Sequence, residues 1–153
     1  EIAQRHLNDG VEVWLVTAAP EDMATLIAER LGFTGAIGSK AAIEDGHYTG
    51  AMNGPLLHGR EKASAIQELA KENGFDLANC FGYSDSYNDL PLLLTVGNPS
   101  AINPDAKLRI RALQERWPIH DFRRMRFLNR LLGPMVSRLA WIGTRLTPRR
   151  NKR

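Results

Sequence analysis

The segment 81–91 holds the polar side chains with the clearest chemical potential in this sequence. Asp85 and Asp89 stand four residues apart, directly after an apolar run, with hydroxyl and amide side chains between them. A polar loop that follows an apolar strand is how a parallel α/β sheet presents reactive groups at its carboxyl edge. Carboxylate oxygens suit Mg²⁺, which takes few protein ligands. We therefore predict a metal site with Asp85 and Asp89 as ligands. The alternative is that Asp85 caps the next helix and Asp89 is an acid of its first turn.

Two further residues could bind a phosphate near that loop. Thr17 follows the apolar run 11–16, where a hydroxyl and the following N–H groups can hold a phosphate oxygen. Lys62 falls in the first turn of a predicted helix, where the helix dipole disfavours a cation unless an anion is gathered there. The plainer alternatives are a helix-capping hydroxyl for Thr17 and a solvated surface lysine for Lys62.

Strand and helix patterns alternate along the chain, which is typical of a parallel α/β sheet. The turn signals around Gly46 predict a hairpin, and Gly32 and Gly74 predict helix ends. In the helix that begins at Pro20, apolar residues recur at helical spacing from Met23 to Leu31. The predicted elements are strands over 11–16, 36–38, 77–83, 95–102 and 118–122, a hairpin over 41–52, and helices over 1–8, 20–31, 59–73, 88–94 and from 104 onward.

Charge divides the sequence into an acidic domain and a basic tail. Residues 1–122 carry 10 Lys/Arg and 17 Asp/Glu, a formal charge of −7, whereas residues 123–153 carry 10 Lys/Arg and no acid. Cys80 is the single cysteine, so an internal disulfide is excluded and a reducing, cytoplasmic location is expected. No apolar segment is long enough to span a bilayer. The sequence thus predicts two regions, 1–122 and 123–153.

Taken together, the polar motifs resemble three of the four motifs of the haloacid dehalogenase (HAD) superfamily. Thr17 resembles motif two, Lys62 in Gly-Arg-Glu-Lys resembles motif three, and the segment 82–91 resembles motif four. The hairpin with its following loop, 45–62, and the segment 96–105 are similar to the phosphoserine-phosphatase-like IB subfamily. The resemblance covers residues 1–122 and implies a Rossmann-like core with a parallel sheet.

The resemblance also implies a reaction. In the family, an aspartate attacks phosphorus and forms an aspartyl-phosphate that water hydrolyses, while Mg²⁺ and a lysine offset the phosphoryl charge. Carried over, Asp85 would bind Mg²⁺, and Asp89 would support the metal shell or hold Lys62. Thr17, Lys62 and Asn88 would contact the phosphate. The implied substrate is a small phosphomonoester such as phosphoserine, or a lipid phosphate.

One family motif has no counterpart in this sequence. The first motif is a pair of aspartates one residue apart, and Asp-x-Asp does not occur between Glu1 and Arg153. We therefore expect a chain truncated at its N-terminus, which lacks the first strand, the nucleophile and the helical cap. The alternative is a catalytically inactive fragment that acts as a binding module or at a membrane surface.

Residues 123–153 have the pattern of a basic amphipathic helix, interrupted at Gly133-Pro134. Its apolar stripe could pack on the domain, on a partner or on the segment expected to be missing. Its arginines and Trp141 could instead place it on an anionic membrane surface. Nucleic acid is a less favoured partner, because the tail has few aromatic side chains for stacking on bases.

Overall fold

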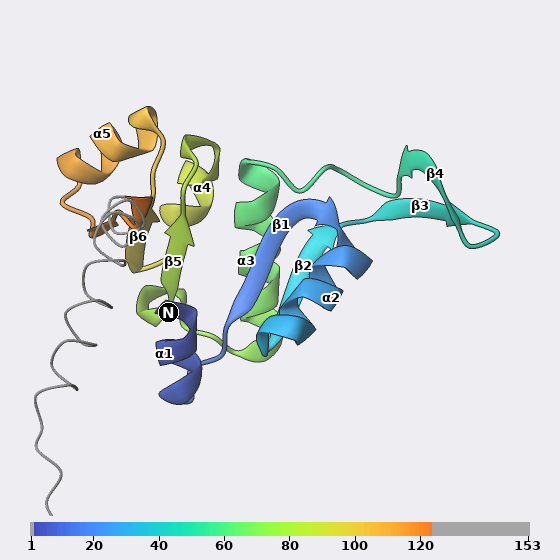
Figure 1. Cartoon of the computed structure of the whole chain (residues 1–153), viewed down its shortest axis with the longest axis horizontal. Helices are drawn as coiled ribbons and strands as arrows, with labels where there is room; N and C mark the ends of the chain where they lie inside the picture. The colour runs from blue at the N-terminus through green and yellow to red at the C-terminus, as the bar shows by residue number, and fades with distance from the viewer. Residues whose placement is uncertain (1, 124–153) are drawn as a thin grey trace, which may run out of the picture.

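The computed structural model describes residues 2–123 and has helices packed around parallel strands (Figure 1). The predicted tail therefore lies outside the described residues, apart from Arg123. The strands are β1 (Trp14–Pro20), β2 (Gly35–Ser39), β3 (Ala41–Glu44), β4 (His47–Met52), β5 (Phe81–Ser84), β6 (Asn98–Ile102) and β7 (Ile119–His120). The helices are α1 (Ile2–Asn8), α2 (Glu21–Leu31), α3 (Arg60–Asn73), α4 (Leu90–Leu93) and α5 (Ala106–Gln114), with short 3₁₀ turns η1 (Leu77–Asn79) and η2 (Tyr87–Asp89).

Parallel pairing dominates the strands, as predicted, and it occurs in two groups. β1 pairs with β2, and Val16 lies opposite Ile37. β5, β6 and β7 form a second parallel group, in which Tyr83 lies opposite Ser100. Within residues 2–123, β1 and β5 do not pair with each other, so each group has an unpaired edge strand.

A groove of about 560 Å³ separates the two strand groups. One side carries Val16 of β1 and the other carries Phe81 of β5, while Ile66 of α3 and Leu92 of α4 also line it. The lining is mostly apolar, and the carboxylate of Asp89 belongs to it as well. The groove therefore runs over α3 between two parallel strands that each lack a partner on one side among residues 2–123 (Figure 1).

The hairpin of β3 and β4 confirms the turn predicted at residues 44–46. The strands are antiparallel, and Glu44 pairs with His47. Asp45 and Gly46 have φ angles of 50° and 77°, the left-handed conformation that two-residue hairpin turns require at both positions. The hairpin extends away from the rest of the molecule (Figure 1).

The hydrophobic core lies on the β5–β6 side of the molecule. Leu93 of α4 and Leu108 of α5 are fully buried, and they form one cluster with Ile66 of α3.

Helix α2 packs differently from what its apolar stripe suggests. Its small residues Ala24 and Ala28 are buried, whereas its larger apolar side chains, from Met23 to Leu31, stay exposed.

Several element boundaries differ from the predicted ones. β5 begins at Phe81 and not at residue 77, because the Asp76 carboxylate accepts a hydrogen bond from the Ala78 N–H and caps a 3₁₀ turn there. β1 continues past Thr17 to Pro20. The last helix begins at Ala106, since Asp105 occupies the N-cap position.

Helix α1 contacts β5 through the partly buried phenol of Tyr83. The Tyr83 hydroxyl lies 2.8 Å from His6 Nε2, and burial raises the pKa of Tyr83 above its ordinary value of 10.0. A raised pKa in the folded state means that Tyr83 stabilises the fold below pH 10, and that this contribution is lost as pH rises through the folded-state pKa. We expect the free energy of unfolding to fall more steeply above pH 10 in the wild type than in Tyr83→Phe. Urea unfolding at several alkaline pH values measures this, and parallel slopes in the two proteins would contradict it.

Candidate active site

A lysine, a carboxylate and a hydroxyl meet at the carboxyl end of β5. Lys62 Nζ lies 2.9 Å from one Asp89 oxygen and 3.0 Å from the other, and the Ser84 hydroxyl donates to Asp89 over 2.8 Å. The side chains of Lys62 and Asp89 are only 12% and 14% exposed. Lys62 is therefore not the solvated lysine that its sequence position also allowed. Instead, an ion pair with little solvent screening is built into this edge of the molecule.

The local backbone explains why these groups meet. Ser86 caps η2 by accepting a hydrogen bond from the Asn88 N–H, and the Asp89 N–H donates to the Ser86 carbonyl over 3.1 Å. This turn carries Asp89 back toward the end of β5. Helix α3 lies against η2, with Gly59 at its N-cap position near the Asn88 carbonyl oxygen, and Lys62 in its first turn lies next to Asp89.

Asp85 and Asn88 occupy the exposed part of the same loop. Capping falls to Ser86, so Asp85 does not serve as the cap of the following turn. Asp85 supplies the hard oxygen donor that Mg²⁺ prefers. Both oxygens of Asp89 already contact Lys62. Among residues 2–123, no three His, Cys, Asp or Glu side chains cluster as a complete metal site. The described residues therefore fit only part of a Mg²⁺ shell, in which Asp85 would be a more available ligand than Asp89.

Thr17 lies within β1 of the other strand group, directly after Val16 and three residues before the strand ends at Pro20, so the strand does not end before Thr17 as predicted. Its hydroxyl accepts a hydrogen bond from the Ala19 N–H over 3.2 Å, and Pro20, not Thr17, is the N-cap of α2. Ser39 joins this edge to the loop before α3: its hydroxyl donates to the Ala18 carbonyl and accepts from the Leu57 N–H. The ends of β1 and β2 are thus tied to the segment that leads to Lys62.

Asp105, for which the sequence predicted no role in the site, is hydrogen-bonded to the acidic loop, residues 85–89. Its carboxylate accepts hydrogen bonds from the Leu108 and Tyr87 N–H groups, each over 2.8 Å. These two bonds lower the pKa of Asp105 below its ordinary value of 3.8. The sequence also predicted no specific role for Ser84. Asp105 stands just before a helix, where aspartate is a favoured N-cap, and this position could have identified it as a residue with a structural role.

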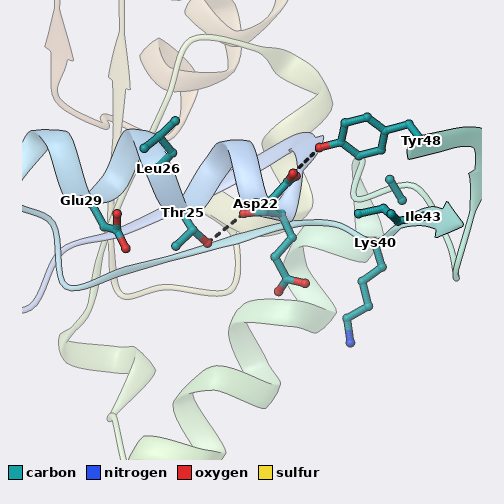
Figure 2. Close-up of a pocket in the computed structure, with 9 residues that line it drawn as sticks. Asp22, Thr25, Leu26, Glu29, Lys40, Ile43 and Tyr48 are labelled. Carbon is teal, nitrogen blue, oxygen red and sulfur yellow. Dashed lines mark hydrogen bonds between the residues drawn. The ribbon is translucent and has the colours of Figure 1, made fainter. Parts of the chain in front are cut away.

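A second hollow, of about 570 Å³, lies between α2 and the hairpin, away from these residues (Figure 2). There the Tyr48 hydroxyl points at Asp22 and donates a hydrogen bond to its carboxylate, which lowers the pKa of Asp22. None of the candidate residues Thr17, Lys62, Asp85, Asn88 and Asp89 lines this hollow.

Parallel strands joined through helices, with a lysine–carboxylate pair at their carboxyl edge, define a Rossmann-like α/β protein. The model of the haloacid dehalogenase-like hydrolases matches residues 1–94. The chain belongs to this family. The predicted family and fold class are therefore confirmed.

The related proteins carry phosphatase names. The chain is 46% identical to phosphoserine phosphatase SerB1 of Mycobacterium tuberculosis over 153 residues, which is 100% of the chain and 50% of that protein. It is 38% identical over 141 residues to the probable phosphatase Rv3661 of the same organism, covering 92% of the chain and 49% of that protein. A Bordetella pertussis crystal structure described as a protein of unknown function matches with a TM-score of 0.72 and 32% identity, over 78% of this chain and 55% of that one.

The chain thus spans about half the length of the curated relatives that it matches. No helix within residues 2–123 is long and apolar enough to cross a bilayer.

Proposed function

We propose that this chain is the C-terminal portion of a Mg²⁺-dependent phosphomonoesterase that works through an aspartyl-phosphate. The observation that carries the proposal is the Lys62–Asp89 pair, little exposed, at the carboxyl edge of parallel strands. A positive charge kept out of water attracts a phosphoryl group more strongly than a solvated one. Asp89 keeps the lysine oriented before substrate arrives.

The other candidate residues take roles around this pair. Thr17 and Asn88 would contact phosphate oxygens, and Asp85 would bind Mg²⁺. The metal would supply charge neutralisation for the phosphoryl oxygens. Asp89 would support the metal shell through its place in the same loop, while its oxygens hold Lys62. The Ser84 hydroxyl would keep Asp89 in place.

The nucleophile would come from polypeptide outside residues 2–123. The groove between β1 and β5 supports this view, because the described part of the chain leaves both strand edges unpaired there and the lining is largely apolar. A strand placed in the groove would pair with both edges and end beside Asp89. Unpaired edges are otherwise unfavourable in a folded sheet. The family's first motif has the residues such a strand needs, two aspartates one residue apart.

A small phosphomonoester such as phosphoserine is the proposed substrate, and the name of the 46% identical relative supports this choice. A lipid phosphate is the other candidate substrate. The single cysteine, Cys80, makes a reducing compartment such as the cytoplasm the proposed location.

Hydrolysis assays test the proposed function directly. The purified 153-residue chain is expected to hydrolyse neither p-nitrophenyl phosphate nor phosphoserine, because the nucleophile is outside it. A longer version with an apolar strand ending in Asp-x-Asp before Glu1 is expected to hydrolyse them, and only with Mg²⁺. Changing the first of those aspartates to asparagine is the control and should abolish turnover. Robust Mg²⁺-dependent hydrolysis by the chain alone would refute the external nucleophile, and an inactive longer version would favour a binding module.

A further inference from the structure

The loop that leads into α5 contacts both sides of the acidic loop. The Asp105 N–H donates to the Asp85 carbonyl over 2.8 Å, and the Asp105 carboxylate accepts from the Tyr87 N–H over 2.8 Å. These two bonds fix the backbone on either side of Ser86. Since Ser86 caps the turn that carries Asp89, the contacts from Asp105 constrain the whole path from Asp85 to Asp89.

A helix cap alone would not need this arrangement. The cap bond uses one carboxylate oxygen of Asp105, which accepts from the Leu108 N–H. The second oxygen and the backbone N–H are directed at a different element, the acidic loop. Asp105 therefore joins the first turn of α5 to the loop that follows β5.

The two residues that precede Asp105 are held in place by burial and by hydrogen bonds. Pro104 is buried, and the Asn103 N–H donates to the His120 carbonyl over 2.8 Å. The Asn103 side chain accepts a hydrogen bond from the Phe122 N–H over 2.8 Å. Asp105 is thus held between β6 and α5 on a backbone that is hydrogen-bonded to the β7 segment, and it can transmit that rigidity to the acidic loop.

We propose that Asp105 is a positioning residue that fixes the acidic loop, and with it the geometry of Asp85 and Asp89. This inference deepens the proposed function and rests on it, because the geometry of the loop matters if Asp85 binds Mg²⁺ and Asp89 holds Lys62 as proposed. Partners behind metal ligands typically change metal affinity when they are removed, although they never touch the metal. Asp105 acts on the backbone of the loop in the same indirect way.

The test uses Asp105→Ser in the purified chain, with Asp76→Ser as the matched control. Serine is as good a helix cap as aspartate but has one side-chain oxygen. Asp76 has the same design elsewhere: one oxygen accepts from the Ala78 N–H and the other from the Asn79 side chain. Both variants keep a cap and lose the second contact, but only one of them touches the acidic loop.

Hydrogen exchange measured by NMR is the primary readout. In Asp105→Ser, we expect the Tyr87 amide to exchange about tenfold faster, as for loss of one hydrogen bond to a charged group. The α5 amides should change little, and Asp76→Ser should leave the acidic loop unchanged. If the Tyr87 amide exchanges at the same rate in the wild type and in Asp105→Ser, the positioning role is wrong. The role is also wrong if the exchange rates of all core amides rise together, because the variant then destabilises the whole fold.

A Mg²⁺ titration of the same proteins, followed through the amide shifts of residues 85–89, separates this inference from the proposed function. We expect Asp105→Ser to weaken Mg²⁺ binding by about tenfold. Absence of Mg²⁺ binding in the wild type would count against the proposed metal, while the Tyr87 exchange rate would still decide the role of Asp105. Wild-type affinity in Asp105→Ser, at equal fold stability, would overturn the positioning role.

Discussion

Lys62→Met is expected to lower kcat/KM for phosphoserine by about 100- to 1000-fold in the longer, active version of this protein. The Lys62 side chain is 12% exposed and lies in the first turn of α3, at the edge where the phosphoryl group is proposed to bind. Methionine keeps the length of the side chain and removes the charge. The loss should appear mainly in kcat, because the phosphoryl charge that the lysine offsets is redistributed in the transition state.

Lys71→Met is the matched control for this prediction. Lys71 lies in the last turn of the same helix and is exposed, so its replacement tests the effect of removing a lysine from α3 away from the site. Its kcat/KM should stay near the wild-type value. Activity in Lys62→Met within threefold of the wild type would contradict a direct electrostatic role for Lys62.

Asp89→Asn is expected to reduce the free energy of unfolding by about 3 kcal/mol. The asparagine has the shape of aspartate and its oxygen can still accept from the Ser84 hydroxyl, so the change removes little besides the charge. It leaves the Lys62 ammonium in a largely buried site without its counter-ion. Uncompensated charges in such sites are among the costliest single changes in a folded protein. Urea unfolding of the purified chain measures the difference.

An exposed ion pair is the appropriate comparison for Asp89→Asn. Arg111 and Glu115 form an i, i+4 pair in which the side chains are 36% and 40% exposed, and Glu115→Gln is expected to cost no more than about 0.5 kcal/mol. The double variant Lys62→Met with Asp89→Asn should lose less than the two single variants added together, because they share one interaction. Additive losses would mean that the pair contributes no coupling energy.

Sequence patterns identified the elements but not all of their ends. The alternation of strand and helix, the hairpin turn at Asp45-Gly46 and the glycine helix ends follow from local preferences, so they were readable in advance. The start of β5 was not, because Asp76 uses its side chain to make a capped turn in a segment that reads as a strand. The exposure of Ile27 on α2 could not be predicted either, because helical spacing shows which residues share a face of the helix but not whether another element covers that face.

The sequence by itself determined the residues available for chemistry: a lysine, two spaced aspartates and a threonine, each beside a strand or helix end. It also determined the family, because the order and spacing of these motifs are specific. The pairing of Lys62 with Asp89 was one of two roles considered for Asp89, and the tertiary structure shows that this contact forms. Lys62 and Asp89 are 27 residues apart, and they meet because α3 begins beside η2.

The role of Asp105 depended on the fold in the same way. Its second oxygen reaches Tyr87, 18 residues away, across adjacent loops of the β5–β6 group. A sequence shows which donors and acceptors are present and in what order. A hydrogen bond or ion pair forms only where the packing of strands and helices brings the two partners within about 3 Å.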